Sequence, residues 1–167
     1  MATRNFARIY GIAFLLFGIL GFVPGITPMH HDHSAEGLVV GGPGHGMLFG
    51  LFHVNLLHNI VHLAFGVMGL AMAGRYESAR NYARIVAISY GLLTVMGLIP
   101  GLNTMFGLVP IHGNDVWLHA LLALPAAYFG FVRPATEMRT DEYNAAGTTR
   151  TGTTGVLADD DEQTATR

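Results

Sequence analysis

Histidine and asparagine side chains recur at helical spacing in one apolar stretch of the sequence. Between residues 48 and 73 the chain carries Asn55, His58, Asn59 and His62. A helix turns by about 100° per residue, so these four side chains share one helical face. Imidazole and amide groups hydrogen-bond well, imidazole also binds metal ions, and both are costly to place against lipid. We therefore expect this polar stripe to face the interior of a helix bundle.

A second polar pair lies at the start of another apolar stretch. Asp115 and His119 are four residues apart, and hence on one face of a helix. Counted from the same end of the bundle, His119 and His58 reach a similar depth, so we expect the two rings to approach each other. The predicted intramembrane polar cluster consists of Asn55, His58, Asn59, His62, Asp115 and His119.

Three interpretations of this cluster stay open at the level of sequence. In the first, the side chains only hydrogen-bond between helices, at about 0.6 kcal/mol per bond. In the second, His58, His62 and His119 ligate zinc, copper or haem iron, and Asp115 orients one of them. In the third, the cluster is a pathway for protons or small solutes. The first interpretation predicts no cofactor.

A further set of histidines lies between the first two apolar stretches, in the predicted outer loop 26–46. Short His-rich tracts bind copper or zinc, and the neighbouring Met29 and Met47 add thioether groups that favour Cu(I). The alternative is a polar, Gly-rich loop in which the histidines are incidental. The candidate ligands in this loop are His30, His31, His33 and His45.

The sequence shows no catalytic pattern, and we predict that the protein is not an enzyme. No Ser/His/Asp arrangement, phosphate-binding loop or paired acidic residues are visible. The chain has no cysteine, which excludes disulfides, Cys-ligated zinc and iron–sulfur clusters. Its net charge of −2 makes nucleic acid an unexpected partner.

The elements that must position these residues are four long apolar blocks. Of the 167 residues, 51% are hydrophobic and only 12% are charged, whereas soluble domains carry about 25% charged residues. A membrane-spanning helix needs about 20 apolar residues. We therefore predict an all-α fold, a four-transmembrane-helix bundle within residues 1–139. The predicted spans are 6–25, 48–73, 82–101 and 115–133.

The arginines predict the orientation of this bundle. They flank the apolar blocks on one side only, and the two predicted outer loops carry no Lys or Arg. By the positive-inside rule, both termini are cytoplasmic and the protein is a multi-pass protein of the cell (inner) membrane. A cleaved signal peptide is the alternative for the first block, which lacks an obvious cleavage site. The flanking residues are Arg4, Arg8, Arg75, Arg80, Arg84, Arg133 and Arg139.

Two further features concern the organisation of the chain. Tyr10-Gly11 and Pro24-Gly25 around the first block are matched by Tyr90-Gly91 and Pro100-Gly101 around the third. This order indicates two tandem copies of a two-helix unit, with chance similarity as the alternative. Residues 140–167 are rich in Thr, Gly, Ala and Asp, and we expect them to form a disordered cytoplasmic tail.

Three motifs together resemble a known family. They are Gly-Phe-Val-Pro-Gly at 21–25, the segment from Asn55 through His58, Asn59 and His62 with Gly66, and Trp117-Leu-His119. From Arg4 to Val132 the chain resembles the family called domain of unknown function 4383. The resemblance implies a small four-helix membrane protein, of a kind found mostly in bacteria, and it implies no established activity or cofactor.

The combined prediction is a non-enzymatic membrane protein. We expect a small membrane subunit, or an accessory or interaction protein, built around the polar cluster. Its expected partners are the lipid bilayer and either further copies of itself or a larger membrane complex. A metal- or haem-binding protein is the first alternative, and a proton or small-solute pathway is the second.

Overall fold

The structure is a computed structural model, and it describes residues 1–28 and 45–133. The chain divides into a unit Met1–Arg133 and a unit Pro134–Arg167, of which the second is not described. The predicted tail 140–167 and the candidate ligands His30, His31 and His33 therefore lie outside the described residues.

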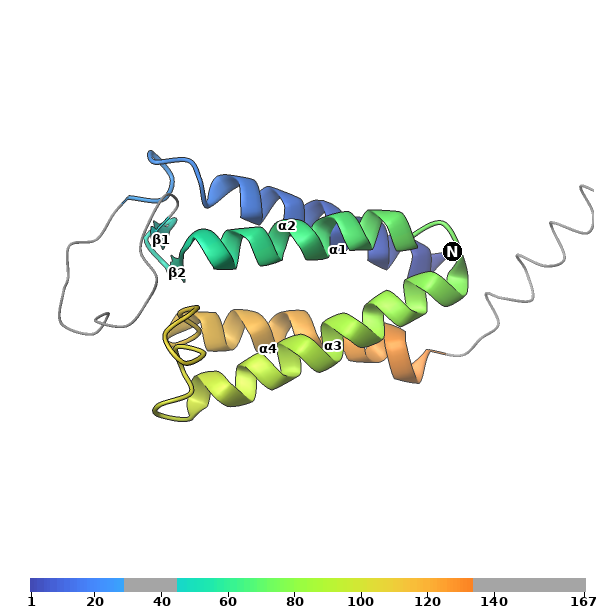
Figure 1. Ribbon diagram of the computed structural model, residues 1–167. Helices are drawn as coiled ribbons and strands as arrows, with labels where there is room; N and C mark the ends of the chain where they lie inside the picture. Colours follow the sequence, from blue (N-terminus) through green and yellow to red (C-terminus); the bar gives the residue numbers. More distant parts are fainter. Residues whose placement is uncertain (29–44, 134–167) are drawn as a thin grey trace, which may run out of the picture. The chain divides into compact units, whose positions relative to one another are not determined.

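The described part of the chain is mostly helical. Its elements are α1 (Ala2–Leu20), β1 (Gly46–Leu48), β2 (Phe52–Val54), α2 (Leu56–Met72), α3 (Tyr76–Leu98), α4 (Asn114–Ala127) and the π-helix η1 (Tyr128–Val132). Helix α1 packs along α2, and α3 packs along α4 (Figure 1). The mainly helical class agrees with the sequence analysis, but the two strands were not predicted.

The β-hairpin corrects the predicted second span, 48–73. Strands β1 and β2 pair antiparallel, with Met47 opposite His53, and α2 begins only at Leu56. The turn between the strands has positive φ angles at Phe49 (55°) and Gly50 (70°), which a right-handed helix does not adopt. Asn55 then has an extended backbone, with φ −145° and ψ 179°, and is the N-cap of α2.

The other helix ends also differ from the predicted spans. Helix α1 ends at Leu20 instead of residue 25, because the chain turns at Gly21. Helix α3 begins at Tyr76 instead of residue 82, so it includes Arg80 as well as Arg84. The Nε atoms of both arginines donate to the carbonyl oxygen of Gly130 in η1, each at 3.0 Å. This pairing lets the charged turn of α3 pack against η1.

Glycines bring α1 and α2 into close contact. A Cβ atom at Gly66 would lie 2.6 Å from Cγ of Leu15 and 2.8 Å from its backbone nitrogen. A Cβ at Gly69 would lie 2.8 Å from Cα of Gly11. Small residues allow two helix backbones to approach this closely. Gly11, Gly66 and Gly69 therefore lie in the contact surface of the α1–α2 pair.

The helices differ in length and apolar character. Within the described residues, Ala2–Leu20 and Asn114–Val132 are both 19 residues long and apolar enough to cross a membrane. Helix α2 is also apolar but has 17 residues. Helix α3 has 23 residues and carries its charges in its first half.

We predict that Gly66→Ala destabilises the protein by about 1–3 kcal/mol, because the added methyl group must displace Leu15. Gly91→Ala is the matched control on α3, since no atom lies within 4 Å of its added Cβ. The control gains up to about 1 kcal/mol from the better helix propensity of alanine. The measurement is the free energy of unfolding in detergent micelles, and equal changes for the two variants would contradict the close contact.

Candidate functional site

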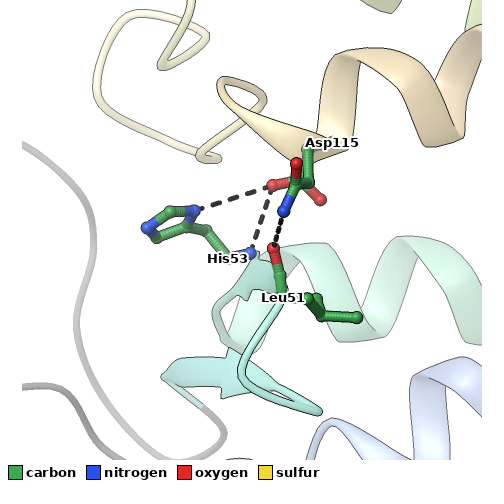
Figure 2. A network of polar contacts seen from close by, with 4 residues as sticks. Leu51, His53 and Asp115 are labelled. Atoms are coloured by element: carbon green, nitrogen blue, oxygen red, sulfur yellow. Dashed lines mark hydrogen bonds and ion pairs between the residues drawn. The ribbon is translucent and has the colours of Figure 1, made fainter.

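The polar cluster lies at the hairpin end of the helices, by which we mean the end where β1, β2 and the segment 99–113 lie (Figure 1). One part of the cluster, which we call the joint, links the hairpin and the start of α2 to the start of α4 and the segment before it. Asp115 is fully buried, and its Oδ2 accepts a hydrogen bond from the backbone N–H of His53 at 3.1 Å. The same oxygen lies 3.8 Å from Nδ1 of His53 (Figure 2). Nδ2 of Asn114 donates to the carbonyl oxygen of Leu51 at 3.2 Å.

Asn55 forms the second part of this joint. Its Oδ1 accepts from the backbone N–H of His58, and its Nδ2 donates to the carbonyl oxygen of Leu108, both at 2.8 Å. The side chain is fully buried. One amide therefore caps α2 and also ties its first turn to the segment that leads into α4.

Three histidines lie deeper in the bundle, below these joints. Nε2 of His58 is 3.2 Å from Nε2 of His62, and the two rings are almost perpendicular. The ring of His119 lies with its centroid 6.3 Å from that of His58, and it packs edge-on against Tyr90 at 5.2 Å. The three imidazoles are 5%, 5% and 2% exposed. The structure thus brings the predicted residues His58, His62 and His119 to one place.

These histidines line a cavity of about 160 Å³, which we call the histidine cavity. Besides the three histidines and Tyr90, the residues of its wall are aliphatic or Met. A second cavity of about 90 Å³ lies between α1 and α4, and His62 contributes to its wall as well. The histidine cavity is lined by Leu57, His58, Val61, His62, Tyr90, Leu93, Met105, Leu108, Val109, Ile111 and His119.

Two predicted roles change in the structure. In the metal-binding interpretation Asp115 orients one of the three histidines, but in the structure its Oδ2 bonds to His53, because the hairpin brings that residue against the start of α4. Asn59 is fully buried and lies against α1, where a Cβ at Gly21 would collide with its amide group. It does not line the histidine cavity. The cluster therefore separates into a joint at the hairpin and a group of cavity-lining histidines.

Sequence reasoning missed several residues of this site. Tyr90 was noticed only as part of a repeated pattern, and the segment 105–111 was taken as a loop. The asparagine-capping pattern at Asn55 was the available signal for a helix start, because asparagine is a favoured N-cap residue.

The arrangement of the described side chains does not add support to the metal-binding interpretation. Within residues 1–28 and 45–133, no group of three or more His, Cys, Asp or Glu side chains is placed so that it could hold a metal ion. His45 is half-buried and directly precedes β1. Metal binding by His58, His62 and His119, or by the His-rich loop, stays a prediction.

We predict that Asn55→Ala destabilises the protein by about 2–4 kcal/mol. The change removes a helix cap, worth about 0.5–2 kcal/mol, and leaves the Leu108 carbonyl without its donor, at about 1–3 kcal/mol. Asn114→Ala is the control, because its single bond to Leu51 is exposed, and we expect a loss below about 1 kcal/mol. Unfolding free energies in detergent measure both, and a smaller loss for Asn55 would argue against the joint.

Comparison with known proteins gives one family and no individual relative. The model of the family described as "Domain of unknown function (DUF4383)" matches residues 4–132, most of the chain. No curated protein matches the sequence, and no solved structure matches the fold. The resemblance carried by the Asn55–His62 segment is thereby confirmed. The chain belongs to the DUF4383 family, whose function is not known.

Proposed function

We propose that this chain is a multi-pass protein of the cell membrane, with four spanning helices and both termini cytoplasmic. We further propose that it acts without catalysis, as a small accessory subunit of a membrane assembly. The observation that carries the membrane location is the distribution of polarity, since polar side chains such as Asn59 and Asp115 are buried while many large apolar side chains are exposed.

The outward faces of the helices are apolar. Ile9 on α1 and Ile88 on α3 are each 64% exposed, and Leu124 on α4 is 70% exposed. Asn59 and Asp115, by contrast, are fully buried. Soluble proteins bury large aliphatic side chains and expose polar ones, and they rarely show wide apolar surfaces. Lipid reverses this preference, so the arrangement fits a bilayer.

The lengths of the elements also support a bilayer. A helix of 19 residues is about 28 Å long, close to the roughly 30 Å of a hydrocarbon core. Helix α2 is shorter, but the hairpin before it satisfies its own backbone groups by strand pairing. Non-helical backbone is tolerated at membrane depth where it is buried in protein, and Leu48 and Val54 of the hairpin are buried.

The basic residues support the orientation. No Lys or Arg occurs between residues 9 and 74, or between residues 85 and 132. Arginines lie in the first turns of α1, around the α2–α3 turn and after η1, all at the end opposite the hairpin. Cytoplasmic ends of membrane proteins carry this excess of basic residues. The hairpin end is then the outer end.

The accessory role is supported by the hydrogen bonds that the joint makes. Asn55, Asn114 and Asp115 direct their polar atoms to the backbone of the hairpin, of α2 and of the segment before α4. Groups held in this way connect the two helix pairs. They favour a structural role for this part of the cluster over a catalytic one.

The topology is tested by cysteine labelling, for which the cysteine-free chain is a ready background. A membrane-impermeant maleimide should label Leu51→Cys at the hairpin tip in intact cells. It should label Gly74→Cys, in the α2–α3 turn, only after the membrane is opened. Leu121→Cys, on the outward face of α4, should react in neither case until the protein is denatured. Both loop positions are exposed, and Leu121 is 65% exposed.

The labelling pattern decides the proposal in two ways. If Leu121→Cys reacts as fast as Leu51→Cys, α4 is in water and the membrane location is wrong. If Gly74→Cys reacts in intact cells and Leu51→Cys does not, the orientation is reversed. Labelling of the unsubstituted chain measures the background.

The accessory role has its own test. We expect the untagged chain, extracted in mild detergent, to migrate on native gels in an assembly larger than its 17.9 kDa and to copurify with a second membrane protein. A chain that is monomeric and without a partner in several mild detergents would contradict this role, and it would leave the topology unaffected.

A further inference from the structure

Two arginine side chains of α3 converge on a single carbonyl oxygen of η1. Nε of Arg80 and Nε of Arg84 both donate to the carbonyl oxygen of Gly130, each at 3.0 Å. Because both bonds end at the same oxygen atom, the two Nε atoms lie no more than twice that distance apart. The contact joins the first half of α3 to η1, at the end opposite the hairpin (Figure 1). Two guanidinium cations are thus held close together between two helices.

The local sequence explains why the arginines reach this oxygen. A Cβ atom at Gly130 would lie 3.0 Å from Cγ and from the backbone nitrogen of Arg84, so glycine lets the backbone of η1 lie against α3. In an α-helix the Gly130 carbonyl would accept from residue 134, which is a proline and has no N–H. The arginines supply the missing donors. A carbonyl oxygen can accept two hydrogen bonds, but it carries no net charge to balance two cations.

The two positive charges have no counter-charge among the described residues. Glu77 is the one acidic side chain that the described residues place at this end, and it forms no ion pair with Arg80 or Arg84. Both arginines are half-buried. Like charges held this close repel each other, and the repulsion grows where water is partly excluded. An anion bound to both guanidinium groups would remove this repulsion.

The guanidinium groups also keep donors for such an anion. Arg80 uses its Nε, and Arg84 uses its Nε and its Nη1, which donates to Oδ1 of Asn81 at 3.1 Å. The other Nη groups form no hydrogen bond with the described residues. Cζ of Arg84 also lies 5.8 Å from the centroid of the Phe131 ring. Because the planar arginine fork matches phosphate oxygens, these two fixed forks suit a phosphate group.

The surface beside the arginines indicates the source of the phosphate. Phe131, next to Gly130, is 53% exposed. Ile88, one turn after Arg84 and on the same face of α3, is 64% exposed. A free phosphate ion gains nothing from these apolar side chains, whereas the acyl chains of a lipid would cover them. Basic pockets between membrane helices at the cytoplasmic side bind anionic lipid headgroups.

We propose that Arg80 and Arg84 form a binding site for the phosphate group of an anionic lipid, whose acyl chains lie along Ile88 and Phe131. The inference rests on the proposed membrane location and does not require the accessory role. Lipid binding is measured on the purified chain, whereas cysteine labelling reports the location in cells. A failure of one is therefore distinguishable from a failure of the other.

The test titrates the purified full-length chain, in a mild non-ionic detergent, with lipid, and counts the bound lipid molecules by native mass spectrometry. The probes are phosphatidylglycerol and phosphatidylcholine with the same acyl chains. We expect one saturable site that binds phosphatidylglycerol about tenfold more tightly, because the ammonium group of phosphatidylcholine cancels the phosphate charge beside two cations. Inorganic phosphate, added as a competitor at the concentration of the lipid, should not displace phosphatidylglycerol.

Variants locate the site. Arg80→Gln/Arg84→Gln should lower the affinity for phosphatidylglycerol by about tenfold or more. Arg8→Gln/Arg75→Gln is the matched control, because it removes the same charge from two exposed arginines at the same end. Exposed charges are screened by salt, so the control should lose at most about threefold. If the first variant does not fold, Arg80→Gln alone keeps the bond from Arg84 to Gly130 and should still lose more affinity than Arg8→Gln.

Three results would overturn the proposal. The first is equal affinity for the two lipids in the unsubstituted chain. The second is an equal loss in the Arg80/Arg84 variant and in the Arg8/Arg75 control, which would indicate diffuse attraction without a defined site. The third is displacement of phosphatidylglycerol by an equal concentration of inorganic phosphate, because the arginines would then bind free phosphate and not a lipid.

Discussion

The buried amide of Asn55 is the interaction on which the arrangement of the site depends. It ends the hairpin, caps α2 and binds the segment that leads into α4. Because the first residue of a helix determines the direction of every later side chain, this cap determines where His58 and His62 point. The same amide holds Leu108, part of the cavity wall, against the start of α2.

The inward direction of the polar residues on α2 could be predicted because helical periodicity is a local property. His58, Asn59 and His62 are the polar residues of an apolar helix, and the 100° rule places them on one face. The start of that helix could not be found from hydropathy. Hydropathy does not distinguish apolar strands from an apolar helix at Met47, Leu48, Phe52 and Val54. Only the turn at Phe49–Gly50 shows that these residues form a hairpin and not a helix.

The partners within the site could not be predicted for a different reason. A spacing of four residues placed Asp115 on the same helical face as His119, yet the hairpin places the backbone of His53 beside Asp115, and Asp115 bonds there. The cavity likewise depends on the segment 99–113, which folds through positive φ angles at Met105 (46°), Phe106 (59°) and Gly107 (86°). These conformations are set by long-range packing, and neither Met nor Phe favours them.

The placement of the two cavities has a consequence for how the molecule responds to hydrostatic pressure. The histidine cavity lies between α2 and the α3–α4 pair, and the smaller one lies between α1 and α4. Contacts within the α1–α2 pair are tight, because glycines let the two backbones touch. Pressure favours states that eliminate internal voids. The compressible part of the protein is therefore the boundary between the helix pairs, and compression acts there before it acts within α1–α2.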